Sequence, residues 1–355
     1  MSVCKSVLSL NPYQGGKPIS ELQRELGLEK VVKLASNENP LKVSPKVKEA
    51  ITNSLDDIGR YPDGNGFELK KSISNHLSIG PQSITLGNGS NELLELIARM
   101  YLCSSDDEVI YSQYSFVVYS MVAKAIGAKS IVTPAENFGH DLNAMLNSIT
   151  SKTKLIFVAN PNNPTGTLLS DGDIFEFISM VPSSVIVVLD QAYFEYLDTD
   201  NNTLEWLSKF SNLIITRTFS KAYGLAGLRV GYSLSSEEIA DYMNRIRQPF
   251  NVSHIAQSAA IAALTDQDFL SKSIKSNNEG LNQLSKGFDS LGLSYIKSSA
   301  NFISLDVESP NSIYEKLLSK GFIVRPIEIE GHLRVTVGTI QENKDFLDAL
   351  SSVLD

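Results

Sequence analysis

Three short apolar runs in the middle of the chain constrain its fold most strongly. They are rich in β-branched residues and continuously apolar, over residues 155–159, 185–189 and 213–216. This pattern is typical of parallel strands that are covered on both faces. Helical patterns lie between the runs, such as that of residues 173–179. Because strands that alternate with helices indicate βαβ units, the sequence predicts an α/β fold with a mainly parallel sheet between helices.

A polar residue follows each of these three runs. Asn163 comes soon after the first, Asp190 directly after the second, and Lys221 a few residues after the third. Ligands of open α/β sheets bind outside the carboxyl ends of the strands. We therefore expect these three side chains to line one site.

The segment from Thr218 to Gly231 sets Lys221 among small residues and follows it with Arg229. A lysine that reacts with a carbonyl compound needs an uncrowded turn and a way to lose its charge. A phosphorylated ligand needs hydroxyls and a guanidinium nearby. The segment thus predicts a covalent site for a phosphorylated carbonyl cofactor; the alternative is a glycine-rich turn with a solvated lysine.

Two other motifs could hold parts of such a ligand. Gly89, Ser90 and Asn91 precede a helical stretch, and glycines there let backbone N–H groups converge on an anion. Ser90 or Asn91 could instead be a simple N-cap. Asp190 follows an apolar run, and a buried carboxylate is costly unless it is paired with a cation such as a protonated pyridine nitrogen. The alternative for Asp190 is a cap of the turn.

Composition excludes several classes of function. The net charge is −9 and there is no basic run, which argues against a nucleic-acid partner. No apolar stretch approaches the length of a membrane span, and the N-terminus has no signal-peptide pattern. Cys4, Cys103 and the four histidines show neither a disulfide framework nor metal-ligand spacing. We expect a cytoplasmic protein without a metal site.

The pattern changes near residue 253. Helical patterns over residues 256–264 and 279–291 are followed by strand-like segments at 302–305, 322–324 and 333–337. Helices and strands that are segregated in this way favour a smaller α+β domain.

Together these motifs resemble those of the fold-type I aminotransferases, which use pyridoxal 5'-phosphate (PLP), and most closely the branch that contains histidinol-phosphate aminotransferase. The matching motifs are Asn-Pro-Tyr-Gln (11–14), Asn-Glu-Asn-Pro (37–40), Arg-Tyr-Pro-Asp (60–63), Gly-Asn-Gly-Ser-Asn-Glu (87–92), Asn-Pro-Asn-Asn-Pro-Thr-Gly (160–166), Asp-Gln-Ala-Tyr (190–193) and Leu-Arg-Val-Thr-Val-Gly (333–338). They fall in the family's order. The resemblance implies a fold-type I PLP transferase with a large PLP-binding domain over 37–252, a small domain over 253–355, and an N-terminal arm over 1–36 that packs with the small domain.

The resemblance also implies roles for individual residues. Lys221 would hold PLP covalently and move the reacting proton, while Asp190 would keep the ring nitrogen protonated. Tyr193 and Asn163 would bind the 3′ oxygen of the ring. Phe116 would stack on the ring, with Tyr114 as the rival. The residues implied at the cofactor phosphate are Gly89, Ser90, Asn91, Thr218, Ser220, Arg229 and, from the neighbouring subunit of a homodimer, Tyr61.

For the substrate, the resemblance implies contacts from Arg334, Arg325, Tyr13 and Asn37. Two arginines suit a phosphate ester, although Arg325 could instead form a salt bridge at the rim. The implied reaction converts L-histidinol phosphate and 2-oxoglutarate to imidazole-acetol phosphate and L-glutamate, in histidine biosynthesis. The alternatives are an aromatic amino-acid aminotransferase and a threonine-phosphate decarboxylase. A PLP-binding regulator without turnover is disfavoured because the family motifs begin too early to leave room for a DNA-binding domain.

Overall fold

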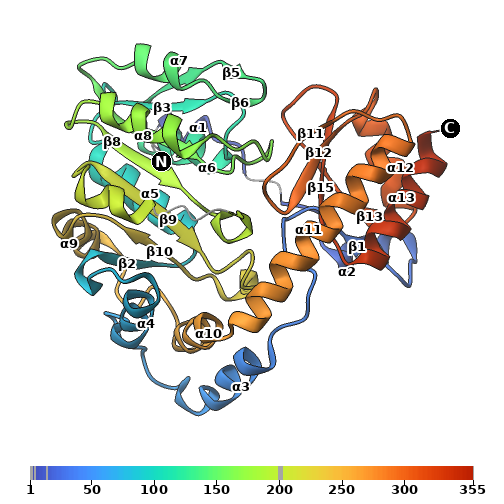
Figure 1. Ribbon diagram of the computed structural model, residues 1–355, viewed down its shortest axis with the longest axis horizontal. Helices are drawn as coiled ribbons and strands as arrows, with labels where there is room; N and C mark the ends of the chain where they lie inside the picture. Colours follow the sequence, from blue (N-terminus) through green and yellow to red (C-terminus); the bar gives the residue numbers. More distant parts are fainter. Residues whose placement is uncertain (1–2, 4, 13–14, 199–202, 355) are drawn as a thin grey trace.

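The protein divides into a large unit built on a seven-stranded sheet and a small unit built on a four-stranded sheet (Figure 1). The computed structural model describes residues 3, 5–12, 15–198 and 203–354. Among these residues, none of the helices combines the length and the apolar composition needed to cross a membrane.

The large sheet has the strand order β2-β10-β9-β8-β7-β3-β4. The neighbours β9, β8, β7, β3 and β4 are mutually parallel, and only β10 runs antiparallel to both of its neighbours. This confirms the predicted mainly parallel sheet, and the three apolar runs lie in β7, β8 and β9. The strands are β2 (Ile84–Gly87), β3 (Glu108–Ser112), β4 (Lys129–Thr133), β7 (Thr153–Ala159), β8 (Ile186–Asp190), β9 (Leu213–Thr218) and β10 (Gly231–Leu234), with a separate hairpin of β5 (Ala135–Glu136) and β6 (Gly139–His140).

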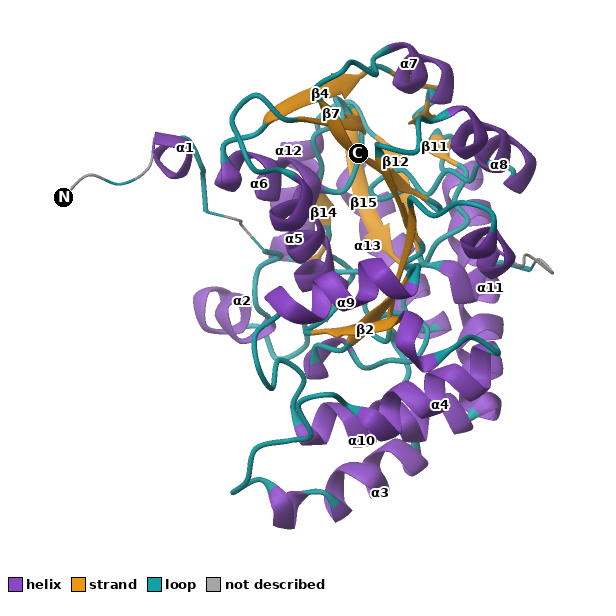
Figure 2. Ribbon diagram, turned by 90° about the vertical axis from the view of Figure 1, so that its left-hand side faces the viewer, coloured by secondary structure: helices purple, strands orange, loops and turns teal. Residues whose placement is uncertain are grey.

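Helices cover both faces of this sheet, which explains why its strands are continuously apolar (Figure 2). In β7, Leu155 and Phe157 face a core shared with α5, α6 and α9, whereas Ile156 and Val158 face the core on the other side. Full burial of each such side chain contributes about 1.5–3 kcal/mol. The helices of the large unit are α3 (Pro45–Asn53), α4 (Phe67–Leu77), α5 (Ser90–Tyr101), α6 (Val117–Ile126), α7 (Leu142–Asn147), α8 (Asp171–Met180), α9 (Glu237–Ile246) and α10 (His254–Thr265). Short 3₁₀ helices are η1 (Leu55–Asp57), η2 (Pro81–Ser83), η3 (Phe194–Tyr196), η4 (Thr203–Ser208) and η5 (Ala226–Leu228).

The small unit packs helices against one antiparallel sheet of order β11-β12-β15-β14. Its elements are the C-terminal part of α11 (Gln267–Ser290), β11 (Tyr295–Ile296), β12 (Phe302–Asp306), α12 (Pro310–Ser319), β13 (Phe322–Ile323), β14 (Arg325–Pro326), β15 (His332–Thr336) and α13 (Ile340–Leu354). The arrangement is the α+β unit that the sequence predicts.

Most of the described N-terminal arm lies against the small unit. β1 (Val32–Lys33) pairs in parallel with β13, and Leu22 of α2 (Ile19–Leu26) packs in a small cluster with Ile323. In Figure 1 this blue segment lies beside the red C-terminal helices. The first helix, α1 (Lys5–Leu8), lies instead beside α6 of the large unit, where the Ser6 hydroxyl donates to the Ala125 carbonyl at 3.3 Å.

Helix α10 lies with the large unit, although it follows the predicted boundary at residue 253. Its buried alanines, among them Ala256 and Ala260, share the core that contains α3 and α4. Small side chains allow these helices to approach closely. The core changes within α11, because Leu270 packs in the large core and Leu284 in the small one.

Candidate active site

The carboxyl ends of the parallel strands bring the predicted site residues to one edge of the sheet. Asp190 is the last residue of β8 and pairs in register with Ala159 on one side and Thr216 on the other. Lys221 follows β9, and its Nζ lies 5.6 Å from the centre of the Tyr193 ring. Asn163 follows β7 and accepts a hydrogen bond from Arg334 of the small unit. The site therefore lies where the two units meet.

Asp190 is buried and held by two hydroxyl groups. Tyr119 donates to Oδ2 at 2.7 Å and Thr216 donates to Oδ1 at 3.0 Å. Burial raises the pKa of the Asp190 carboxyl, and these hydrogen bonds oppose the rise by favouring the ionised form. The Tyr119 ring is itself buried and stacks on Phe157 with centroids 4.5 Å apart. The carboxylate is thus fixed in place before any cation reaches it.

Sequence reasoning missed both hydroxyl donors. Thr216 is the last residue of the third apolar run, so the sequence pattern indicates only that it belongs to a strand. Tyr119 lies in the first turn of α6, three residues after Phe116, which is the N-cap of that helix. That spacing is the signal that could have found it.

Lys221 is half-buried between the two units. Its Nζ donates to the backbone carbonyls of Asn37 at 3.2 Å and Ser36 at 3.5 Å. Burial lowers the pKa of Lys221 to about 7, and the charge of Arg334 adds to this effect. A substantial fraction of the amine is therefore neutral near neutral pH, as a nucleophile requires.

The turn before α5 forms a cradle for an anion. A side chain at Gly89, which has a φ of 77°, would place its Cβ 2.5 Å from Arg229 Nη2, so only glycine fits there. Arg229 Nη1 also donates to the Ser220 hydroxyl at 3.3 Å. The backbone N–H of Ser220 donates to Thr218 Oγ1 at 3.1 Å. A guanidinium, two hydroxyls and the N-terminus of a 12-residue helix therefore converge.

Glu92 stabilises the turn before α5 through two hydrogen bonds. Its Oε2 accepts from the backbone N–H of Asn88 at 2.6 Å and from the Asn251 amide at 2.7 Å. The bond to Asn88 resembles the glutamate half of a capping box and fixes the entry into α5. Ser90 is buried in the cradle, whereas Asn91 is exposed on the first turn, so its predicted contact with the phosphate stays a prediction.

Of the two candidates for stacking on a ring, Phe116 contacts the residue that is bonded to Asp190. Its ring meets that of Tyr119, the phenol bonded to Asp190, edge-on at 5.9 Å. The Tyr114 ring packs instead toward Phe138, with centroids 6.1 Å apart. The choice of Phe116 as the stacking residue stays a prediction.

Two arginines of the small unit lie directly opposite each other. Arg325 and Arg334 are cross-strand partners in the antiparallel pair of β14 and β15, so their side chains leave the same face of the sheet. Arg334 donates to Asn163 Oδ1 at 2.7 Å and to the Ala35 carbonyl at 2.8 Å. The pair is a candidate anion site.

The last three predicted residues are Asn37, Tyr61 and Tyr13. Asn37 is buried, and its side chain contacts Tyr193 and Thr336. Tyr61 is 83% exposed and stacks on Phe250 at 4.7 Å. Tyr13 lies outside the described residues. The substrate contacts of Tyr13 and Asn37 and the phosphate contact of Tyr61 stay predictions.

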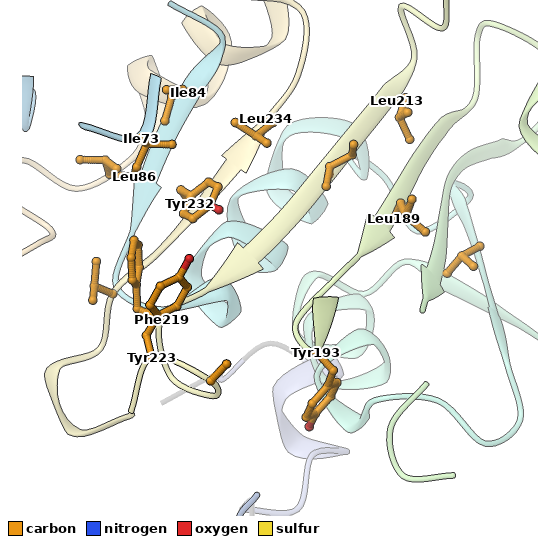
Figure 3. Packing of buried hydrophobic residues seen from close by; sticks show 14 of the residues in the cluster. Ile73, Ile84, Leu86, Leu189, Tyr193, Leu213, Phe219, Tyr223, Tyr232 and Leu234 are labelled. Atoms are coloured by element: carbon orange, nitrogen blue, oxygen red, sulfur yellow. The ribbon is translucent and has the colours of Figure 1, made fainter. Parts of the chain in front are cut away.

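The residues present fit PLP, the cofactor that the sequence predicts. Asp190 is a buried carboxylate whose hydroxyl donors are neutral, which suits a cationic ring nitrogen. The Gly89 turn and Arg229 suit a phosphate, since a Cβ would fill the turn. Lys221, with its lowered pKa, suits the aldehyde carbon. In Figure 3, Tyr193 projects below the strand ends, away from the apolar side chains packed along the strands.

The cofactor-free protein gives a test of the Asp190 environment. Because its pKa is raised in the folded state, ionisation of Asp190 destabilises the fold as pH rises through that pKa. Asp190→Asn should therefore unfold at higher urea concentration than wild type at pH 7, and the difference should vanish below about pH 4.

Glu108 provides the matched control with the opposite sign. It is also shielded from solvent, but Lys129 and Thr150 hold its pKa below the ordinary value. Glu108→Gln should be less stable than wild type at pH 7, and this gap should close as pH falls through the same range. If Asp190→Asn behaved like Glu108→Gln, the carboxylate would be stabilised by its present neighbours and would not await a cation.

Comparison with known proteins agrees with this geometry. The family model described as aminotransferase class I and II matches residues 29–350. Histidinol-phosphate aminotransferase 1 of Psychrobacter arcticus is 53% identical over 98% of this chain and 94% of its own length, and that of Idiomarina loihiensis is 50% identical over 98% and 96%. The crystal structure of histidinol-phosphate aminotransferase from Sinorhizobium meliloti in complex with pyridoxal-5'-phosphate superposes with a TM-score of 0.93 at 29% identity, covering 99% of this chain and 97% of that one. The chain belongs to the class I and II aminotransferases.

Proposed function

We propose that this protein is a PLP-dependent aminotransferase that converts L-histidinol phosphate and 2-oxoglutarate to imidazole-acetol phosphate and L-glutamate, in histidine biosynthesis. The observation that carries the proposal is the position of Lys221, a half-buried lysine with a pKa of about 7 between the buried Asp190 and the arginine pair. Relatives that are 53% and 50% identical over almost the whole chain carry the name histidinol-phosphate aminotransferase, which supports this choice.

The residues of the chain would divide the work as follows. PLP, when bound, supplies a ring that withdraws electrons from the reacting carbon. Asp190 keeps a positive charge at the ring nitrogen favourable. Lys221, once free, would take the proton from the α-carbon of the substrate as a general base and then, as a general acid, deliver it to the cofactor carbon that had carried the aldehyde oxygen. A pKa near 7 suits both roles, because neither protonation state is scarce.

The arginine pair favours a phosphate ester among the possible substrates. An amino-acid carboxylate needs one bidentate arginine, whereas a phosphate dianion can use two. Arg334 and Arg325 together therefore suit histidinol phosphate better than phenylalanine. A threonine-phosphate decarboxylase would also need a phosphate site, so turnover with both phosphate esters must separate these two readings.

Covalent attachment at Lys221 can be tested directly. The protein with PLP should absorb in the visible, and borohydride should fix the cofactor to the peptide that contains Lys221. Lys221→Ala should take no label, whereas Lys30→Ala, which alters an exposed lysine paired with Asp345, should label fully. Label on a different lysine would refute the assignment.

Substrate choice can be tested at Arg325. A charged hydrogen bond to a dianion contributes about 1.5–3 kcal/mol, so Arg325→Ala should lower kcat/KM for histidinol phosphate roughly ten- to a hundredfold. Glutamate, whose α-carboxylate could still bind Arg334, should lose less in its half-reaction. The measurement is single-turnover absorbance for each half-reaction, with Arg245→Ala, an exposed arginine on α9, as the control. Equal losses for both substrates would favour the aromatic aminotransferase reading.

We also infer that the active form is a homodimer in which Tyr61 reaches the cofactor phosphate of the neighbouring subunit. The support is a cluster of large apolar side chains in solvent around that loop, of which Tyr61 is the most exposed. The other exposed members are Leu55, Ile58, Phe67 and Phe250. Tyr61 and Phe250 stack on each other in solvent, and exposed apolar surface of this kind marks interfaces between proteins. The predicted cytoplasmic location stays a prediction.

Mixing inactive Lys221→Ala subunits with Tyr61→Phe subunits tests the contribution of Tyr61. If Tyr61 acts across the interface, exchange between Lys221→Ala and Tyr61→Phe subunits gives heterodimers with one site carrying both defects and one carrying neither. Wild-type-like cofactor affinity and turnover should then reappear in part of the sites. Proven exchange without recovery would mean that Tyr61 serves its own subunit or none.

A further inference from the structure

Asn37 is the residue through which the small unit reaches the reacting lysine. It is 1% exposed and has a φ of 54°, a left-handed conformation that few residues other than glycine tolerate. Its backbone carbonyl accepts from Lys221 Nζ at 3.2 Å, and its side-chain amide donates to the Tyr193 hydroxyl at 2.9 Å. One buried residue therefore contacts both the amine and the phenol.

Asn37 is in turn held by residues of the small unit. Its backbone N–H donates to Thr336 Oγ1 at 2.9 Å, and the same hydroxyl donates to Asn37 Oδ1 at 3.1 Å. The Asn301 amide donates to the Asn37 carbonyl at 3.0 Å, so this carbonyl is shared between Asn301 and Lys221. These bonds fix both the backbone and the side chain of Asn37.

Thr336 connects this junction to the candidate anion site. It lies on β15 two residues after Arg334, and alternate residues of a strand face the same side. Thr336 is buried, and the bonds of its hydroxyl are both to Asn37. Among the hydrogen bonds of the described residues, none joins Thr336 to Lys221 or to Tyr193. We therefore infer that Thr336 acts on these two residues through Asn37.

We propose that Thr336 and Asn37 form a positioning pair: the hydroxyl of Thr336 holds Asn37 so that its carbonyl and amide place the Lys221 amine and the Tyr193 hydroxyl for the reaction. This inference rests on the proposed role of Lys221. The pair keeps the amine in the seam between the units, where burial depresses its pKa. The position of β15, which carries Arg334, thereby sets the position of the reacting amine.

The test replaces the Thr336 hydroxyl without changing the size of the side chain. In Thr336→Val, kcat should fall about ten- to a hundredfold, because small displacements of reacting groups are costly. KM should change less than about threefold, since Arg334 and Arg325 remain. In the cofactor-free protein, the pH midpoint for acylation of Lys221, followed by peptide mass spectrometry, should rise by about half a pH unit or more as water reaches the released amine.

Two controls separate positioning from stability. Thr336→Ser keeps the hydroxyl and should retain the wild-type midpoint and most of kcat. Val335→Ala removes buried methyl groups from the same strand, on the opposite face, and should lower the melting temperature without moving the midpoint. If Thr336→Val does not fold, Asn37→Gly accommodates the left-handed conformation, removes both side-chain bonds, and should give the same rise and the same fall in kcat.

The outcomes are distinct. An unchanged midpoint with kcat within about twofold of wild type, in a folded Thr336→Val protein, would reduce Thr336 to a structural role. A rise in KM at constant kcat would place its effect on Arg334 and would also overturn the proposal. Failure of the proposed function would show separately, as absence of borohydride label on Lys221 in the wild type.

Discussion

The burial of the Asp190 carboxylate is the constraint on which the rest of the site depends. An ionised group in an apolar interior is costly unless its oxygens are bonded and its charge is balanced. The chain meets the first need with hydroxyls from two elements, Tyr119 of α6 and Thr216 of β9, which fixes α6 and β9 relative to β8. The second need, balance of the negative charge, would be met by a cationic ligand. The buried carboxylate thus lies where a pyridinium ring could balance its charge.

A second constraint is that the site is divided between two packing units. Arg334 to Asn163 and Thr336 to Asn37 are side-chain links across the seam, and the Ser304 hydroxyl adds a bond to the Pro164 carbonyl at 2.5 Å. Groups that bind the two ends of a substrate can therefore be held on separate bodies. Because Asn37 also contacts Lys221 and Tyr193, the placement of the small unit and the chemistry are physically connected.

Sequence patterns predict those parts of this structure whose residues share one feature along a whole segment, such as continuous apolar character. Continuous apolar runs predict parallel strands because such strands must be buried on both faces, and their ends predict where polar side chains gather. Pairwise contacts between distant segments carry no such pattern, so the links of Asn37 to Thr336, Tyr193 and Lys221 could not be predicted from one chain. The alanine-rich face of α10 likewise does not indicate which unit the helix joins, because small residues can pack against either unit.

Charge balance explains why a protein with a net charge of −9 concentrates cations here. Arg229 lies on the cradle side of Lys221 and Arg334 on the substrate side, and both lower the pKa of the amine. An anion at either position would cancel part of that repulsion and make the protonated amine more favourable. The amine is therefore most nucleophilic when both anion positions are open and most able to hold a proton when both are filled. Because Arg229 and Arg334 both act on the same lysine, the occupancy of these two positions by anions would change the basicity of the amine.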